Sequence, residues 1–318
     1  MSETASHWDL VRPTRDDIHD VLALMRAFDA AVSGEPDTDL DDIQHSWRSL
    51  ELDRDAWLAK SAQGNLLAYT ALLRHQTDGL RVDIYTQPDL IESAVPGEML
   101  KICLQRAGEL ATGKAAGQVQ RLVAYILHSN HPFRDLFNNA GFEPVRFIYQ
   151  MREVMSGLPQ EPQWPTGIQT RRFVPEKDVY ATYKLIQETF DRPGRVRSSL
   201  EDWKRHMLRP GSYRPDLWTL AFAGEELVGA CLGFDYPDEG WVRQLAVSEE
   251  WRGRGLGAAL LRNAFSVFYT QGKHRVGLTT ESDNPNALAF YERAGMTIRR
   301  QYDEYVKPFT PSAESQNM

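Results

Sequence analysis

The stretch from Trp241 to Leu261, W-V-R-Q-L-A-V-S-E-E-W-R-G-R-G-L-G-A-A-L-L, constrains the fold more than any other part of the chain. An apolar run that is typical of a strand is followed by three glycines within five residues, and a helical pattern of leucines comes next. A glycine-rich turn between a strand and a helix lets backbone N–H groups converge at the positive end of the helix dipole. The stretch therefore predicts an anion site, and a pyrophosphate is the expected guest.

The spacing of the glycines separates this turn from two common phosphate motifs. G-x-G-x-G is one position away from the dinucleotide fingerprint G-x-G-x-x-G, and no Lys-Ser or Lys-Thr pair closes the run as in a P-loop. The run R-G-R-G-L-G instead resembles the coenzyme A signature of the GNAT superfamily of acyltransferases, Q/R-x-x-G-x-G/A, with Arg252, Gly255 and Gly257 at the defined positions. A solvated basic turn is the other interpretation.

A second motif lies downstream at the spacing of the same superfamily. N-P-N-A-L-A-F-Y-E-R-A-G-M, from Asn284 to Met296, resembles the closing motif N-x-x-A-x-x-x-Y-x-x-x-G-F, with Met296 in place of the Phe. The two motifs occur in the expected order, with one predicted helix and one predicted strand between them. The resemblance implies an α/β fold (α+β, with a mixed sheet) that binds acyl-CoA.

The chain repeats one order of predicted elements: strand, two helices, three strands, helix, strand, helix, strand. The segment from Asn130, N-H-P-F-R-D-L-F-N-N-A-G-F, also aligns with the closing motif from Asn284. This pattern resembles tandem GNAT proteins such as mycothiol synthases. We expect a first GNAT-like domain, a proline-rich linker, a second and catalytic GNAT domain, and a flexible tail, at residues 1–155, 156–167, 168–308 and 309–318 respectively.

The first half departs from the motifs at both functional positions. Where the glycine turn should stand, it reads I-E-S-A-V-P-G-E-M-L, with Gly97 as its one glycine and no arginine. Pro96 lacks a backbone donor, and Glu98 adds negative charge. Phe137 stands where the second half has Tyr291. We expect the first half to be a degenerate scaffold, and a vestigial cofactor site is the alternative.

The resemblance implies roles for residues of the second half. The N–H of Leu245 would polarise the thioester carbonyl, and Tyr291 would protonate the departing thiolate; its alternative is a core aromatic residue. Asn284 would lie near the cofactor arm, and a helix N-cap is its other interpretation. The implied cofactor-binding set is Leu245, Ala246, Val247, Arg252, Gly253, Arg254, Gly255, Leu256, Gly257, Ala258, Asn284, Ala287 and Tyr291.

The general base is harder to assign. An alkylamine is protonated at pH 7, and neutralising it costs about 4–5 kcal/mol. The position that carries a Glu in mycothiol synthases falls on Trp241 in this chain. Glu239, two residues earlier, is the candidate base, with Asp235, Asp238, Glu281 or a water chain as alternatives. The residues by themselves favour a solvated turn charge over a base for each carboxylate.

Composition limits the remaining possibilities. The chain has 318 residues, of which 42% are hydrophobic and 25% charged, and a net charge of −8 that opposes non-specific nucleic-acid binding. No membrane span or secretory signal is visible, and no His or Cys spacing suggests a metal site. Cys103 and Cys231 stand in separate halves, which favours the cytoplasm. The expected state is a monomer or homodimer.

The sequence therefore predicts an N-acetyltransferase. It would move an acetyl group from acetyl-CoA to a primary amine of a small molecule or peptide by direct attack, without a cysteine nucleophile. Two alternatives stay open: a mycothiol synthase-like or longer-chain acyltransferase, and a non-catalytic module that binds or senses acyl-CoA.

Overall fold

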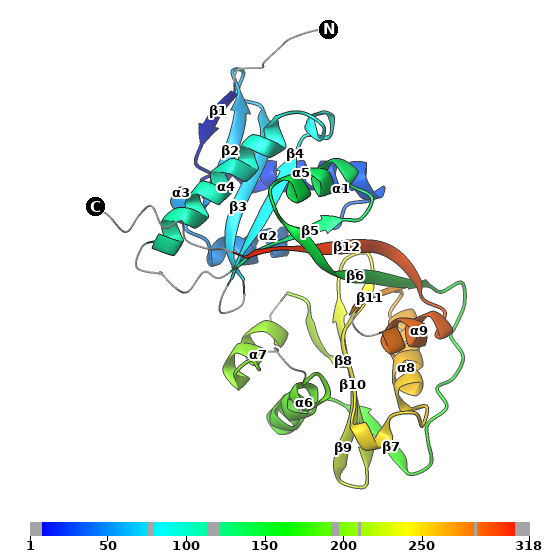
Figure 1. The fold of residues 1–318 in the computed structure, drawn as a ribbon. Helices are drawn as coiled ribbons and strands as arrows, with labels where there is room; N and C mark the ends of the chain where they lie inside the picture. Colours follow the sequence, from blue (N-terminus) through cyan, green and yellow to red (C-terminus); the bar gives the residue numbers. More distant parts are fainter. Residues whose placement is uncertain are drawn as a thin grey trace. The chain divides into compact units, whose positions relative to one another are not determined.

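The computed structural model describes residues 8–75, 79–112, 121–191, 197–208, 211–282 and 285–308 (Figure 1). The predicted tail, residues 309–318, and Asn284 lie outside the described residues. The chain divides into two compact units: unit 1 comprises Met1–Ile148 and Arg300–Met318, and unit 2 comprises Tyr149–Arg299. Each unit is an α/β structure, as the sequence predicts.

Unit 1 is a mixed sheet with helices packed on it. Its strands follow the order β1-β2-β3-β4-β5-β12, in which β4 and β5 run parallel and the other neighbours run antiparallel. Its elements are β1 (Trp8–Val11), η1 (Arg15–Asp17), α1 (Ile18–Ser33), α2 (Leu40–Arg48), α3 (Leu52–Asp55), β2 (Ala56–Ser61), β3 (Leu66–His75), β4 (Gly79–Thr86), η2 (Pro88–Leu90), α4 (Val95–Thr112), β5 (Arg121–Leu127), α5 (His131–Asn139), the first part of β6 (Glu143–Val154) and most of β12 (Thr297–Pro308).

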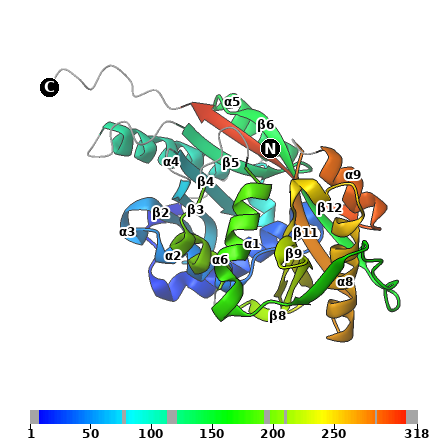
Figure 2. The same ribbon diagram turned by 90° about the horizontal axis from the view of Figure 1, so that it is seen from below.

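Unit 2 repeats this arrangement. Its sheet has the order β6-β11-β10-β9-β8-β7, with β10 and β11 parallel. Helix α6 covers one face and α8 the other (Figures 1 and 2). Its elements are β7 (Ile168–Arg172), α6 (Pro175–Thr189), α7 (Leu200–Met207), β8 (Tyr213–Ala223), β9 (Glu226–Asp235), β10 (Gly240–Val247), η3 (Glu249–Trp251), α8 (Leu256–Thr270), β11 (Arg275–Glu281) and α9 (Pro285–Arg293).

The predicted elements are present, with small shifts at their ends. The largest shift is at β8. The apolar run Leu217–Ala223 predicts a strand that begins at Leu217, whereas the strand begins at Tyr213. Pro215 lies in this early part, and the register of β8 with β9 is irregular between Tyr213 and Trp218. Such an irregularity lets a strand hold a proline that cannot donate to the ladder. Residues 156–167, all described, form no helix or strand, and they lie within unit 2, so that their role as a linker remains a prediction.

The two compact units do not coincide with the two halves of the sequence. Residues 300–308 of β12 belong to unit 1, although the sequence assigns them to the second domain. Residues 149–154 of β6 belong to unit 2, although the sequence assigns them to the first. The predicted domain boundaries follow the repeat in the sequence, whereas the two compact units follow the contacts in the structure. The boundaries themselves remain a prediction.

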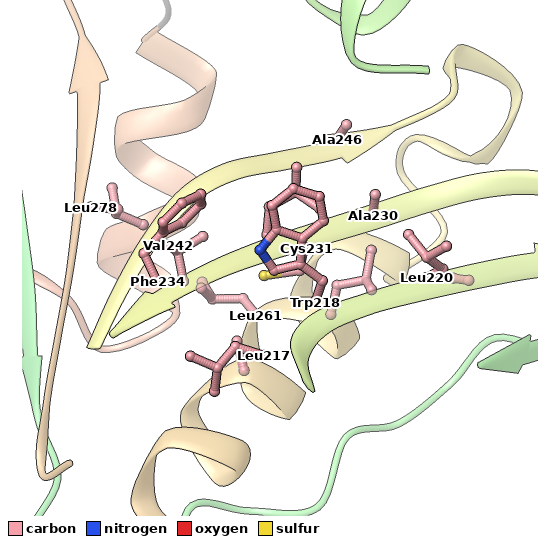
Figure 3. Close-up of a cluster of buried hydrophobic side chains, with 14 of the residues drawn as sticks. Leu217, Trp218, Leu220, Ala230, Cys231, Phe234, Val242, Ala246, Leu261 and Leu278 are labelled. Carbon is pink, nitrogen blue, oxygen red and sulfur yellow. The ribbon is translucent and has the colours of Figure 1, made fainter. Parts of the chain in front are cut away.

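The core of unit 2 holds α8 tightly against the sheet. Figure 3 shows Trp218, Cys231 and Phe234 of β8 and β9 among the buried side chains of this core. Two glycines allow the close approach of Phe268 on α8: a Cβ on Gly233 would lie 2.9 Å from the Phe268 ring, and one on Gly240 would lie 2.3 Å from it. The last turn of α8 is therefore fixed relative to the start of β10.

No helix within the described residues is long and apolar enough to cross a membrane. Among the same residues, no group of three or more His, Cys, Asp or Glu side chains is arranged to hold a metal ion.

Candidate active site

The two parallel strands of unit 2 separate part way along their length. β10 pairs with β11 over three positions, from Gly240 opposite Val276 to Val242 opposite Leu278. Beyond Val242, β10 continues to pair with β9 alone, and its register shifts between Val242 and Gln244. Such a register shift is a β-bulge. One edge of β10 is therefore open from about Gln244 to the end of the strand.

The hydrogen-bond pattern tells which groups face that open edge. Ser248 donates its N–H to the carbonyl oxygen of Val228, at 2.9 Å. Hydrogen-bonded and non-hydrogen-bonded pairs alternate along an antiparallel ladder. Ala246 is thus in the next hydrogen-bonded pair with β9, and the N–H groups of Leu245 and Val247 point away from β9. The N–H of Leu245, the group that the resemblance implies as the polariser of the thioester carbonyl, consequently lies on the open edge together with the N–H of Val247.

The glycine turn follows directly and needs its glycines. Gly253 has φ 74° and Gly255 has φ 85°, a left-handed conformation that other residues adopt only with strain. A Cβ at either position would meet no protein atom within 4 Å, so the backbone, not crowding, requires glycine there. Gly255 is the N-cap of α8, and the first N–H groups of a helix have no partner within it. The turn offers these donors to an anion.

The two arginines of the turn have partners in the protein. Arg252 donates from Nη2 to the carbonyl of Thr189, at 3.3 Å, and from Nε to the carbonyl of Val247, at 3.4 Å. The guanidinium of Arg254 lies 5.1 Å from the centre of the Trp251 ring. Arg252 thus links the turn to the end of α6, a contact that the sequence motif does not reveal. Both side chains remain exposed and add positive charge at the turn.

The first turn of α8 is seated by contacts on both sides. Leu256 is completely buried. A Cβ on Gly257 would lie 3.6 Å from the ring of Phe290 on α9 and 3.7 Å from Val247, which is ordinary contact. Ala258 is half-buried beside it. The two segments that carry the sequence motifs, α8 and α9, therefore meet at this glycine.

Tyr291 lies on α9, where its side chain packs edge-on against Phe290 with the ring centres 5.0 Å apart. Burial, together with the nearby Cys231 thiol, raises the pKa of Tyr291 well above that of an ordinary phenol. The hydroxyl is therefore protonated at neutral pH and able to donate a hydrogen bond. Ala287, four residues earlier, lies on the same face of the helix and is half-buried.

Cys231 is unsuited to nucleophilic catalysis. It is completely buried in β9, and burial raises the pKa of its thiol to about 12. A nucleophilic cysteine needs a lowered pKa and partial exposure. This environment favours direct transfer over a covalent acyl-cysteine route.

Two of the candidate bases, Glu239 and Asp235, form ion pairs with basic side chains. Glu239 accepts from Arg152 Nε, at 2.9 Å, and lies 3.7 Å from Arg299 Nη1, with 14% of its side chain exposed. Asp235 lies 2.9 Å from Lys273 Nζ. Asp238 is exposed and Glu281 half-buried. Arg152 and Arg299 were missed by sequence reasoning, because they come from strands that are distant from β10 along the chain.

Trp241, at the position where the resemblance implies a carboxylate, packs over Gly277 of β11. A Cβ on Gly277 of β11 would lie 2.4 Å from its ring, so only glycine leaves room for this indole. The ring centre is 6.5 Å from that of Tyr236. The position is filled by an aromatic contact rather than by a charge.

The corresponding segments of unit 1 differ from those of unit 2 at both motif positions. Val95 at the start of α4 donates its N–H to Ser93 Oγ, at 3.2 Å, so part of the helix N-terminus is already satisfied. Glu98 in the first turn pairs with Lys101, at 2.7 Å. Phe137 is 1% exposed and packs against Phe142 in the core.

Known proteins share both the sequence pattern and the fold. The family described as Acetyltransferase (GNAT) family matches residues 179–296. A mycothiol acetyltransferase from Geodermatophilus obscurus is 27% identical over 289 residues, which are 87% of this chain and 90% of that protein. One from Catenulispora acidiphila is 26% identical over 310 residues, with 91% and 94% covered.

Solved structures extend the comparison to the whole chain. A GCN5-related N-acetyltransferase from Sphaerobacter thermophilus has a TM-score of 0.82 and 30% identity, with 95% of each chain covered. A tandem GNAT protein from the clavulanic acid biosynthesis pathway has a TM-score of 0.70 and 16% identity, over 96% of this chain and 100% of that one, and shares the fold. This chain therefore belongs to the GNAT family of acetyltransferases, in its tandem-domain form, and is an acyltransferase.

Proposed function

We propose that unit 2 transfers the acetyl group of acetyl-CoA to a primary amine of a small molecule or peptide by direct attack. The open edge of β10, which leads into the left-handed glycine turn, is the observation that carries this proposal. A pantetheine arm can add to that edge like a short strand, and its pyrophosphate can reach the N–H groups of the turn.

The proposed binding residues follow the path of the cosubstrate. Leu245 and Val247 would bond the arm through their main chain, and Ala246, whose main chain pairs with β9, would line the path of the arm between them. The segment from Arg252 to Ala258 would surround the pyrophosphate, with both arginines adding positive charge. Asn284, although outside the described residues, and Ala287 would lie beside the arm.

The chemistry assigns one step to each group. The amine nitrogen attacks the thioester carbon, and negative charge develops on the carbonyl oxygen. The N–H of Leu245 would donate to that oxygen, a contribution of about 3–4 kcal/mol to lowering the barrier. The C–S bond then breaks, and Tyr291 would give its phenolic proton to the sulfur. The products are the N-acetylated amine and free CoA.

Glu239 remains the candidate for removing the amine proton. Its carboxylate is held by Arg152, so any transfer from the amine has to compete with that hydrogen bond or pass through water. A water chain is therefore the alternative route at this step.

The acceptor is proposed to be a small amine, and a thiol-sugar amine is the second candidate. The relatives described as mycothiol acetyltransferases favour the second candidate, whereas Trp241 in place of a carboxylate favours a different acceptor. A longer acyl group and a non-catalytic acyl-CoA sensor are the remaining alternatives. We also propose a reducing cytoplasm, since Cys103 and Cys231 are both free and buried.

Release of CoA from acetyl-CoA, measured with a panel of alkylamines, amino sugars and a cysteinylated amino sugar, tests the proposal. Turnover with a simple amine supports it, and turnover restricted to the thiol-sugar amine selects the second candidate. Tight binding of acetyl-CoA with no turnover across the panel would instead identify a sensor.

A further inference from the structure

Unit 1 contains a cavity of about 130 Å³ at the place where its own parallel strands separate. β4 and β5 pair over three positions, from Gly79 opposite Arg121 to Arg81 opposite Val123. The later residues of both strands, together with α1 and the start of α5, line the cavity. A volume of this size corresponds to about four water molecules at their share of liquid volume, or a ligand of a few non-hydrogen atoms.

The lining of the cavity suits a cation. The described residues that line it include no Lys or Arg, but they include three carboxylates, Asp29, Asp37 and Asp83. Aromatic rings make up much of the remaining wall, and rings attract organic cations through their negative faces. The rings belong to Phe28, Tyr85, Tyr125, Phe133, Phe137 and Tyr302.

Two of the three carboxylates already have a cationic partner. Asp37 lies 2.7 Å from Arg300 Nη1, and Asp83 lies 2.7 Å from Arg81 Nη2. Asp29 forms no ion pair among the described residues, and Arg300 lowers its pKa by less than burial raises it. Its Oδ2 accepts from the N–H groups of Asp37 and Thr38, at 3.1 and 3.3 Å, and from the Thr38 hydroxyl, at 3.0 Å.

Asp29 therefore has one carboxylate oxygen that can bind a ligand. Its Oδ1 has no partner within the part of the chain that the structure describes. Burial raises the pKa of this carboxyl despite the hydrogen bonds to Oδ2, which shows that the charge is poorly compensated. An ammonium group in the cavity would supply the missing compensation.

Two polar groups of the cavity wall lack partners. Asn130 is 4% exposed; its Oδ1 caps α5 by accepting from the N–H of Phe133, at 3.3 Å, which leaves its Nδ2 as a donor without an acceptor among the described residues. The hydroxyl of Tyr85 is likewise unpaired within that part of the chain. An unpaired buried amide costs free energy unless a ligand or water satisfies it. The Asn130 amide can donate a hydrogen bond to a ligand oxygen, and the Tyr85 hydroxyl can exchange one with it.

We propose that this cavity is a binding site for a small amino alcohol, separate from the catalytic site of unit 2. The ammonium group contacts Asp29 Oδ1 and the surrounding rings. The hydroxyl accepts from Asn130 Nδ2 and exchanges a hydrogen bond with Tyr85. The reactive end of an acyl-CoA fits less well, because it carries no cation and the helix that follows lacks a pyrophosphate turn.

Titration of the full chain, saturated with CoA so that no acetyl transfer occurs, tests the site. Ethanolamine is the probe, ethylamine lacks its hydroxyl, and ethylene glycol replaces its ammonium group by a hydroxyl. Ethanolamine is expected to bind, ethylamine to bind about threefold more weakly, and ethylene glycol to show no saturable binding. Absence of ethanolamine binding, or equal binding of ethylene glycol, overturns the proposal.

Variants of unit 1 assign the binding to this cavity. Asp29→Asn keeps an acceptor for Asp37 and Thr38 but removes the charge, and is expected to weaken ethanolamine binding about tenfold or more. Tyr85→Phe is expected to reduce the preference over ethylamine, because only the hydrogen bond from Asn130 then remains for the ligand hydroxyl. Asp89→Asn, at an exposed position of the same unit, is the control.

The outcome is decisive even where one variant folds poorly. Thermal unfolding checks each protein, and Tyr85→Phe alone still tests the hydroxyl preference if Asp29→Asn does not fold. Ethanolamine affinity that is unchanged in a folded Asp29→Asn or Tyr85→Phe protein places the binding elsewhere and overturns the proposal. A second acetyl-CoA site per chain that is lost in Asn130→Asp also overturns it.

Discussion

Units 1 and 2 have the same separated pair of parallel strands but different helix starts after it. In each unit the parallel pairing covers three positions and then ends. In unit 2 the chain continues into a turn with two left-handed glycines, whereas in unit 1 the hydroxyl of Ser93 satisfies the N–H of Val95. The separation of the two parallel strands is thus a property of the fold. The two units differ in the segment that follows, which carries the left-handed glycines in unit 2 alone.

The comparison extends to the aromatic residue on the next helix. Tyr291 in unit 2 and Phe137 in unit 1 stand at matching places of the repeated motif. Phe137 is 1% exposed, and Tyr291 is half-buried. One oxygen atom separates a possible proton donor from a core residue. The two units therefore show that the same fold forms with either a tyrosine or a phenylalanine at this position.

The largest expected effect is that of Tyr291→Phe. Without the phenolic proton donor, we expect kcat to fall about 100-fold, because general acid catalysis contributes at least that much. The KM for acetyl-CoA should stay within about twofold, since the hydroxyl acts at the transition state. Steady-state kinetics with the best amine of the panel provides the measurement.

Tyr305→Phe is the matched control in unit 1. Tyr305 is 1% exposed, so this change also removes a hydroxyl from a buried ring. We expect it to leave kcat unchanged. If both variants lose turnover equally, the effect of Tyr291→Phe is one on packing, and its role as an acid is rejected.

Glu239→Gln should have the next largest effect, with a fall in kcat/KM of about 30-fold at pH 7, because water can partly replace a base. The loss should shrink as the pH approaches the amine pKa of about 10.4, where the free amine needs no base. Asp55→Asn is the control, since Asp55 is 17% exposed and pairs with Arg106 at 2.7 Å. A loss that is independent of pH would exclude the base.

Gly255→Ala should raise the KM for acetyl-CoA about tenfold. A Cβ at φ 85° strains the turn by about 1–2 kcal/mol and turns its N–H groups away from the phosphates. Gly97→Ala in unit 1 places a Cβ in ordinary contact, 3.7 Å from Leu136, within a helix. It should leave KM unchanged and raise stability slightly. Equal KM values for the two variants would show that the turn does not bind the cosubstrate.

The sequence predicts most of the fold because both units are built from local patterns. Apolar alternation locates β3 and β4 to within about two residues, and glycine and proline mark the ends of most helices. The exchange of strand ends between the compact units could not be predicted. It depends on which neighbour the last residues of β6 and β12 join, and a strand pattern carries no information on its partner.

The candidate site was predictable where a motif fixes the backbone. The glycine turn that contains Gly253 and Gly255 follows from their spacing, whereas the point at which β10 separates from β11 was not predicted. The partners of Glu239 could not be foreseen, because ion pairs between distant segments leave no periodic signal. The cavity of unit 1 could not be predicted for the same reason, because its carboxylates come from a helix, a loop and a strand.

The smallest expected effects concern two carboxylates, one in each unit. Burial alone would raise the pKa of Asp178, yet hydrogen bonds from Arg171 and from the N–H of Val174 leave that pKa below its ordinary value. Its ionised form therefore stabilises unit 2 above the unfolded pKa of about 3.9, and this stabilisation is lost as the pH falls through the lower folded value. Asp178→Asn should lower the free energy of unfolding by about 1 kcal/mol at pH 7.

In unit 1 the pKa of Asp29 is shifted in the opposite direction, above its ordinary value. Because burial raises its pKa, its protonated form is favoured in the folded state, and that contribution is lost as the pH rises through the folded value. Asp29→Asn should therefore leave stability at pH 7 unchanged within about 0.5 kcal/mol, or increase it. Urea unfolding of both variants at pH 7 and pH 4 measures the difference. A loss of stability at pH 7 in Asp29→Asn as large as that in Asp178→Asn would show that the Asp29 carboxylate is already compensated, and would remove the reason for a cation beside it.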